Sequence, residues 1–295
     1  MAPPTQIRIS REWLQLLEAL PGGGRVLVVG PSDSGKTTLC QWLVGKLRER
    51  APTAWVDADV GQSQVGPPAC VGWRMAGAER ESFYFVGDVT PATVPLAAAA
   101  ATARAVHDAE AQGAGVAVID TTGYLEGEGA LALKSAKLEL LAPLDLLAVG
   151  DSPPVRRLLA AWHRDQRLRV HRVPTAEGLR RKTPAERCEW RQRLFAASFA
   201  GCDLRRVGLR GLALSGLPTA RELADRGLQW SDLSGLLVGF HDARRRGIVV
   251  GLLHSLDLRG GEMVVRTRPE AESAVGVSFG RIRLRPDGAS LGPCP

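Results

Sequence analysis

One short segment carries the residue types and spacing of a phosphate-binding loop. Residues 30–37 fit the pattern G-x-x-x-x-G-K-[ST], with Lys36 and Thr37 at its end. In such a loop the backbone N–H groups surround phosphate oxygens, the lysine reaches the β- and γ-phosphates, and the hydroxyl binds Mg²⁺. The alternative is a glycine-rich turn without a ligand, but an apolar run precedes the loop and an amphipathic helix follows it. The segment therefore predicts a bound nucleoside triphosphate. The predicted nucleotide-binding residues are Gly30, Ser32, Asp33, Ser34, Gly35, Lys36, Thr37 and Thr38.

Three carboxylates near the ends of predicted strands have the chemistry to assist this loop. Asp120 closes an apolar strand, at the sheet edge where doubly wound folds bind ligands. A carboxylate there suits Mg²⁺ held through water, although an aspartate that only caps a turn has the same pattern. Asp57 and Asp59 share one face of another strand, with Asp59 nearer its end. Asp59 is predicted to accept a proton from the attacking hydroxyl or to bind the metal, and Asp57 is predicted to be structural. The alternative is that both are carboxylates at the strand edge without a catalytic role.

Strands and helices alternate through the first part of the chain. Apolar runs predict strands at residues 25–29, 53–60, 83–86, 116–119 and 144–149. Helical spacing and propensity predict helices at residues 11–20, 35–50, 93–112 and 130–141. This alternation predicts an α/β fold of the P-loop type, in which a doubly wound, mostly parallel sheet carries helices on both faces.

The later part of the chain has a different pattern. Residues 175–199 are predicted to be helical and contain a dense run of arginines. After about residue 205, short segments rich in leucine, glycine and valine predict further strands, at 236–240, 247–253, 263–267 and 276–284. We therefore predict a P-loop domain at 1–204 and a small, mainly β domain at 205–295. The first would include the short N-terminal helix and an arginine-bearing segment at about 180–200.

Composition excludes several classes of protein. The 295 residues are 45% hydrophobic and 5% aromatic, as in a soluble globular protein, and no run of about 18 apolar residues is present. The N-terminus lacks the apolar core of a secretory signal, and the five cysteines form no C-x-x-C pair, so reduced thiols in the cytoplasm are expected. Neither a zinc site nor a G-x-S-x-G hydrolase elbow has the required spacing. A net charge of +7 favours an anionic partner and does not identify it.

Taken together, these segments resemble the polynucleotide 5′-hydroxyl kinase family of RNA processing. Its members include the kinase subunit of the pre-mRNA cleavage and tRNA-splicing machinery, a nucleolar ribosomal-RNA-processing kinase, and bacterial and archaeal relatives. The residues that carry the resemblance are the phosphate loop, 59–68 (DVGQSQVGPP), 87–91 (GDVTP), 120–124 (DTTGY) and Lys134. The segment 59–68 is the part of the resemblance most specific to this family. Phosphate loops occur in many families, whereas this second motif does not. The match covers about residues 25–201, with a looser similarity beyond them.

The resemblance implies an ATP-dependent kinase that transfers the γ-phosphate to the 5′-hydroxyl end of RNA. DNA as a further acceptor, and other nucleoside triphosphates as donors, are left open. It implies that Lys36 and Thr37 bind ATP and Mg²⁺, and that Asp59 is the general base and, with Thr37 and Asp120, a metal ligand. Protein partners are unknown, and no membrane is expected. The residues assigned to the nucleic-acid substrate are Gln62, Thr90, Thr122 and Tyr124. For Tyr124, buried packing is the alternative to stacking on the terminal base.

An arginine-bearing lid closes over the triphosphate in the family that the chain resembles. Arg187 and Arg191 lie four residues apart and therefore on one face of the predicted helix. The resemblance implies that they neutralise charge on the transferring phosphoryl group, with Arg193 as the alternative to Arg191. Taken without the resemblance, the same run of arginines is typical of a solvated helix surface.

Other classes of protein share part of this pattern. A P-loop ATPase or GTPase that acts as a switch or assembly factor would have the same loop and Asp120, without a nucleic-acid acceptor. The guanine-reading N-K-x-D sequence is missing because the chain contains no asparagine, which weakens the GTP version. A catalytically silent subunit is disfavoured by Lys36 and Asp59, and a small-molecule kinase by the basic surplus.

Overall fold

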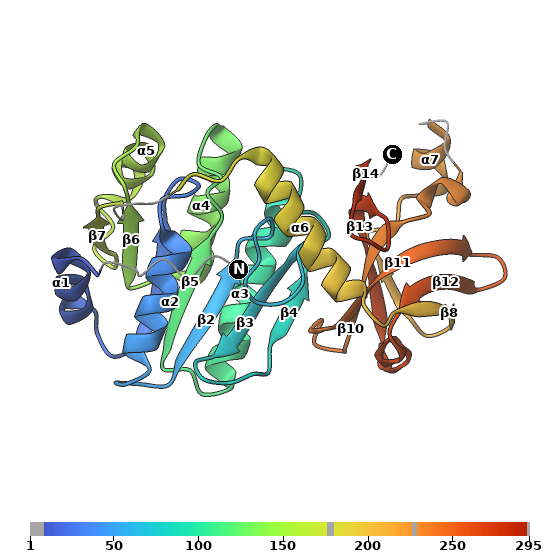
Figure 1. Ribbon diagram of the computed structural model, residues 1–295, viewed down its shortest axis with the longest axis horizontal. Coiled ribbons are helices and arrows are strands. Elements are labelled where there is room, and N and C mark those ends of the chain that lie inside the picture. Colours follow the sequence, from blue (N-terminus) through green and yellow to red (C-terminus); the bar gives the residue numbers. More distant parts are fainter. Residues whose placement is uncertain (1–8, 176–179, 226–228, 294–295) are drawn as a thin grey trace. The chain divides into compact units, whose positions relative to one another are not determined.

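The computed structural model describes residues 9–175, 180–225 and 229–293 (Figure 1). The chain divides into two compact units that interleave along the sequence. The first unit consists of Met1–Asp59, Trp73–Glu81 and Thr102–Lys182, and the second unit of Val60–Gly72, Ser82–Ala101 and Thr183–Pro295. These units are defined by contacts between residues, and each contains several separate stretches of the chain. The domain boundary between residues 204 and 205 therefore stays a prediction.

A parallel sheet forms the centre of the first unit. Its strands pair in the order β2-β5-β1-β6-β7. Their bounds are Thr53–Ala58 for β2, Val116–Thr121 for β5, Gly24–Val29 for β1, Asp145–Val149 for β6 and Arg169–Val173 for β7. Every residue of β2, β5 and β6 is buried, as expected for strands covered on both faces. The register places Asp57 beside Asp120 at the carboxyl ends of their strands.

Helices connect these strands. In the first unit they are α1 (Arg11–Ala19), α2 (Lys36–Leu47), α4 (Glu128–Leu141) and α5 (Pro153–Trp162). The crossover through α2 runs from β1 to β2, whereas the crossover through α4 runs from β5 to β6, in the opposite direction along the sheet. Because such crossovers are right-handed, the two helices cover opposite faces. The predicted doubly wound α/β fold is thus confirmed. Two further elements, β3 (Cys70–Met75) and α3 (Pro95–Ala111), pass from one unit to the other along the chain.

The second unit contains a sheet with the strand order β14-β13-β10-β11-β12-β8, with β9 paired to β13. These pairs are antiparallel except for β9 with β13. The strand bounds are Asp203–Gly208 (β8), Ala213–Ser215 (β9), Leu236–His241 (β10), Gly247–Asp257 (β11), Glu262–Thr267 (β12), Gly276–Leu284 (β13) and Ser290–Pro293 (β14). Phe240, Val265 and Val277 lie in its fully buried core. The predicted mainly β character of this part is confirmed.

Other elements of the second unit are the strand β4 (Ser82–Phe85), the helices α6 (Pro184–Phe199) and α7 (Ala220–Asp225), and two short 3₁₀ turns, Trp230–Leu233 and Pro269–Ser273. The prediction of a helix over 175–199 is wrong for its first part. Helix α6 begins at Pro184 because Thr183 and Glu186 form a capping box and proline suits the first turn. Residues 176–179 of that prediction lie outside the described residues.

Within the described ranges, no helix has both the length and the apolar composition that crossing a bilayer requires.

Candidate nucleotide site and active-site residues

The phosphate loop has the tight backbone that its glycines predict. Gly35 has φ 89°, in the left-handed region, directly before Lys36 opens α2. A Cβ at Gly30 would lie 2.7 Å from the carbonyl oxygen of Val149, so only glycine fits between the loop and β6. The chain therefore turns sharply from β1 into α2 and presents the helix N-terminus, which favours anions.

The two functional side chains at the end of the loop have defined partners. The Nζ of Lys36, a residue only 6% exposed, donates a 2.7 Å hydrogen bond to the carbonyl oxygen of Pro31. The Oγ1 of Thr37 donates a 2.6 Å hydrogen bond to Oδ2 of Asp120. The structure thus brings the loop threonine and the strand-end carboxylate into direct contact. Their assignment to Mg²⁺ stays a prediction.

Asp120 is buried and only partly satisfied. Its other oxygen, Oδ1, has no hydrogen-bond partner among the described residues. Burial raises the pKa of Asp120 to about 6, while the nearby Lys36 charge and the Thr37 hydrogen bond act in the opposite direction. A buried carboxylate oxygen without a donor, beside a threonine hydroxyl, suits a hard cation such as Mg²⁺.

The protein groups do not complete a metal cage by themselves. Among the described residues, no cluster of three or more His, Cys, Asp or Glu side chains is arranged to hold a metal. Mg²⁺ commonly keeps several waters and takes one or two carboxylates together with substrate phosphates. The residues present fit that mode of binding, in which the nucleotide supplies part of the coordination.

The two aspartates at the end of β2 have different surroundings. Asp57 is 1% exposed, and its Oδ1 accepts a 3.0 Å hydrogen bond from the backbone N–H of Asp59. Asp59 itself is half-buried, and its charge contributes to the raised pKa of Asp120. Asp57 therefore orders the backbone at the strand end, and Asp59 remains accessible close to Asp120.

Lys134, which the sequence connected with the site only through a resemblance, holds the loop that follows β5. It is fully buried on α4, and its Nζ donates to Oγ1 of Thr121 at 2.8 Å and to the carbonyl oxygen of Thr122 at 2.6 Å. Thr122 is buried too, and its Oγ1 accepts a hydrogen bond from the backbone N–H of Tyr124. Burial lowers the pKa of Lys134 well below that of an exposed lysine. The half-buried Tyr124 thus stands on a loop that is held by the buried Lys134 side chain.

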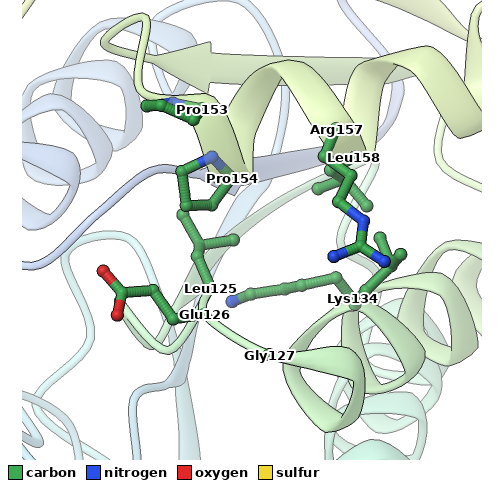
Figure 2. Close-up of a pocket in the computed structure, with 9 residues that line it drawn as sticks. Leu125, Glu126, Gly127, Lys134, Pro153, Pro154, Arg157 and Leu158 are labelled. Atoms are coloured by element: carbon green, nitrogen blue, oxygen red, sulfur yellow. The ribbon is translucent and has the colours of Figure 1, made fainter.

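A cavity of about 230 Å³ lies beside this loop. Figure 2 shows the Lys134 side chain extended along it, with Arg157 and two prolines contributed by α5. The lining residues are Leu125, Glu126, Gly127, Leu131, Lys134, Pro153, Pro154, Arg157 and Leu158.

The remaining predicted residues belong to the second unit. The Nε2 of Gln62 donates to its neighbour Gly61 and, at 3.4 Å, to the backbone carbonyl of Arg187. Within this unit Gln62 and the arginine-bearing helix α6 are therefore in contact. Arg191 is half-buried on the same helix, whereas Arg193 is exposed and pairs with Glu189 at 3.5 Å.

Thr90 lies in a turn ordered by a buried aspartate. The Oδ1 of Asp88 accepts from the backbone N–H of Thr90 at 2.9 Å, and its Oδ2 accepts from the hydroxyl of Thr93 at 2.6 Å. The hydroxyl of Thr93 is also 2.7 Å from the carbonyl oxygen of Thr90. Thr90 is exposed at the tip of this turn.

Sequence reasoning missed one charged residue of the first unit. Lys137 is 1% exposed on α4, and its charge interacts with those of Asp59, Asp57 and Asp120. The available signal was its spacing of three residues from Lys134 on a helix face that is otherwise apolar.

The parallel sheet and the loop between β1 and α2 define a P-loop nucleotide-binding protein. The chain belongs to the family described as the mRNA cleavage and polyadenylation factor CLP1 P-loop, whose model matches residues 30–201. The resemblance seen in the sequence is thus confirmed, and with it the use of a nucleotide.

Known relatives match most of the chain. A polyribonucleotide 5′-hydroxyl-kinase of Pyrococcus furiosus is 27% identical, over 91% of this chain and 90% of its own length. A protein of the same name from Methanocaldococcus jannaschii is 23% identical, over 91% and 89%. The polyribonucleotide 5′-hydroxyl-kinase Clp1 of Xenopus tropicalis is 35% identical over 44% of this chain and 34% of its own. A solved Clp1p–Pcf11p complex has a TM-score of 0.63 at 12% identity, over 92% of this chain and 77% of that chain, which supports the fold.

Proposed function

We propose that this chain is an ATP-dependent polynucleotide 5′-hydroxyl kinase that acts on RNA. The observation that carries the proposal is the meeting of Lys36, Thr37 and Asp120 at the edge of the sheet, with Asp59 at the end of the neighbouring strand. Relatives that carry this activity in their name match the chain over about nine-tenths of its length. The family model covers the phosphate loop as well as the predicted acceptor and lid segments.

The residues of the first unit divide the chemistry between them. Asp59 is the general base that takes the proton of the attacking 5′-hydroxyl, and its partial exposure supports this role. Asp57 holds the backbone of that residue in place. Lys36 exchanges the carbonyl oxygen of Pro31 for phosphate oxygens, where its charge offsets the charge of the transferring group.

Thr37 and Asp120, with Asp59 beside them, are the residues that would hold Mg²⁺. When bound, the ion would neutralise charge on the β- and γ-phosphate oxygens. The threonine hydroxyl is oriented by Oδ2 of Asp120 before any ligand arrives, while Oδ1 of the same carboxylate remains available.

The acceptor strand and the lid involve further residues. Gln62, Thr90, Thr122 and Tyr124 contact the 5′ end of the nucleic acid, for which RNA is the primary substrate and DNA is a candidate. Arg187 and Arg191 on α6 offset charge on the phosphoryl group during transfer. The hydrogen bond from the Gln62 side chain to the backbone carbonyl of Arg187 supports an acceptor residue and a lid residue that lie next to each other. A cytoplasmic location is part of this proposal.

Transfer of labelled phosphate tests the proposal. The protein is incubated with γ-labelled ATP, Mg²⁺ and oligonucleotides that end in a 5′-hydroxyl or a 5′-phosphate. Label is expected on the 5′-hydroxyl RNA alone, and Asp59→Asn is expected to reduce the rate by about 10²- to 10⁴-fold because the general base is lost. Asp287→Asn, at an exposed carboxylate paired with Arg285, is the matched control and should retain the wild-type rate. Acceptor-independent hydrolysis of ATP without any labelled RNA would instead favour a nucleotide-dependent switch.

A further inference from the structure

The sheet of the second unit is irregular around the beginning of one strand. Strand β10 lies between β13 and β11 and begins at Leu236 (Figure 1). The register shifts next to Leu236 in the pairing of β10 with β13, next to Leu253 in the pairing of β11 with β12, and next to Arg283 in the pairing of β13 with β14. The backbone N–H of Gly235 donates to the carbonyl oxygen of Leu253, and Leu236 pairs with Arg283, so the three irregularities meet. Bulges of this kind bend a strand and re-aim its side chains.

A cavity of about 340 Å³ lies at this place in the sheet. Its volume is in the range of sites that bind small ligands. Buried leucines of two strands, Leu252, Leu253 and Leu284, contribute apolar surface to it. Two further lining residues, Leu204 and Leu291, are 50% and 47% exposed. Part of the apolar lining is therefore accessible to a ligand from solvent.

The polar side chains that line this cavity are basic. They are Arg266, Arg283, Arg285 and His254, and the described residues that line the cavity include no aspartate or glutamate. Arg285 is paired with the exposed Asp287 at 3.4 Å, whereas the partners of Arg266 and Arg283 are backbone carbonyl oxygens. An arginine stays charged at every pH at which the protein is folded, so Arg266 and Arg283 give the cavity a fixed positive charge.

The two guanidinium groups are held in place by the backbone. The Nη1 of Arg266 donates a 3.0 Å hydrogen bond to the carbonyl oxygen of Cys202, and the Nε of Arg283 donates a 3.1 Å hydrogen bond to that of Ser234. A guanidinium carries five N–H donors in one plane, so one bond to the backbone orients the group and leaves donors for another acceptor. These oriented forks match the geometry of phosphate oxygens.

The cations stand beside apolar surface, which narrows the class of ligand. The sheet register places Arg266 opposite Leu252 on one side and opposite Leu204 on the other. A free inorganic anion would use the arginines and leave the leucines exposed. A nucleotide has both parts, a phosphate for the guanidinium groups and a base whose face suits apolar side chains. The net charge of +7 further favours a polyanion.

We propose that this cavity binds one nucleotide unit of a single-stranded RNA, with Arg266 and Arg283 on the phosphate and the leucines against the base. The proposal rests on the proposed kinase function, since it concerns the RNA acceptor of that reaction. All the lining residues belong to the second unit, and none of them is among the residues predicted for phosphate transfer. The cavity thus adds affinity for the RNA strand and takes no part in the chemistry.

Binding of RNA without ATP tests this inference. Fluorescence anisotropy of a single-stranded RNA labelled at its 3′ end is recorded with wild type and with the double variant Arg266→Gln/Arg283→Gln. The variant is expected to bind about tenfold more weakly at low salt, because two charge-assisted contacts are lost. The slope of log affinity against log salt concentration should be smaller by about 1.4, since each phosphate contact to a single strand contributes about 0.7. Arg221→Gln, at an exposed arginine of α7 that pairs with Asp225, is the matched control and should bind as wild type does.

A second variant adds a charge and leaves both arginines in place. Leu204→Glu puts a carboxylate at an exposed position of the cavity lining, where a larger side chain can be solvated. It should weaken RNA binding by repulsion of the phosphate. Thermal unfolding of each variant, recorded in parallel, identifies a variant that does not fold.

Two results would overturn the inference. One is RNA binding by the folded variants that equals the binding by wild type. The other is displacement of the labelled RNA by AMP or by poly-glutamate as effectively as by unlabelled RNA at equal concentration of negative charge, which would assign the cavity to a free nucleotide or to an acidic protein. Since no measurement involves phosphate transfer, failure of the kinase assay and failure of this inference are distinguishable.

Discussion

The charged side chains around the phosphate loop of the first unit and those on the surface of the second unit have opposite surroundings. In the first unit the charges near the phosphate loop are almost completely buried, namely those of Lys36, Lys134, Lys137, Asp57 and Asp120. In the second unit, pairs such as Arg206 with Glu262 lie at the surface, where the two side chains are 79% and 43% exposed. Buried charges depend on a few specific partners, whereas exposed pairs are screened by solvent and contribute little individually.

The comparison explains where each unit is sensitive to substitution. A single change near the phosphate loop leaves another buried group without its partner. A single change on the surface of the second unit leaves a group that water can solvate. We therefore expect large, local effects in the first unit and effects on catalysis, more than on stability, from the arginines of α6.

The largest expected effect comes from the two buried lysines of α4. Lys134→Met removes two hydrogen bonds and leaves a buried carbonyl and a buried hydroxyl without their donor, so the free energy of unfolding should fall by about 3 kcal/mol. Lys137→Met breaks no hydrogen bond but removes a positive charge that interacts with the buried Asp57 and Asp120, so the free energy of unfolding should fall by less than in Lys134→Met. Urea unfolding of both variants measures the difference. Equal losses would contradict the distinct partners described for the two side chains.

The next effect concerns the arginines of α6. Arg187→Ala is expected to lower kcat by about 10²-fold, because a cation that offsets charge on the phosphoryl group is lost. Arg193→Ala, on the same helix but exposed and paired with Glu189, is the matched control and should lower kcat less than twofold. Neither change should shift the unfolding midpoint measurably. If the Arg193 variant lost as much activity as the Arg187 variant, a catalytic role specific to Arg187 would be contradicted.

The smallest effect is a pH dependence that originates at Asp120. Burial raises the pKa of this carboxyl above its value of 3.8 in the unfolded chain, so its contribution to stability is fully present below pH 3.8 and is lost as the pH rises to about 6. Asp120→Asn, which cannot ionise, should therefore be more stable than wild type at pH 7, by about 1–2 kcal/mol. The difference should vanish as the pH falls toward 4. Unfolding in EDTA without nucleotide measures it, and a difference independent of pH would exclude ionisation as the cause.

Much of the first unit could be predicted from the sequence, because its local signals agree with its fold. The phosphate loop, the apolar strand that ends before Asp120 and the pattern of helices between strands were predicted from residue types and spacing alone. The proximity of Asp57 and Asp120 follows from the parallel register of β2 and β5, which cannot be read from the sequence. The half-buried state of Asp59 and the partners of Lys134 required the three-dimensional structure.

The elements that sequence reasoning missed have specific physical reasons. Strand β3 contains Gly72, and glycine is typical of a strand interruption. Here a Cβ at Gly72 would overlap the backbone of Val65, so the glycine allows the Val65 backbone to pass close to the strand. Strand β7 is mostly polar because its residues are largely exposed. Helix α5 begins with Pro153 and Pro154, which suggest a loop, although proline is well tolerated in the first turn.

The close approach of Gly123 to the phosphate loop has a mechanical consequence. A Cβ on this glycine would lie 2.5 Å from the backbone nitrogen of Ser32, so the segment that carries Thr122 and Tyr124 rests directly on the turn between β1 and α2. Neither piece has room to shift without displacing the other. Any residue bulkier than glycine at position 123 is therefore expected to displace the turn that contains Ser32, and with it the phosphate loop.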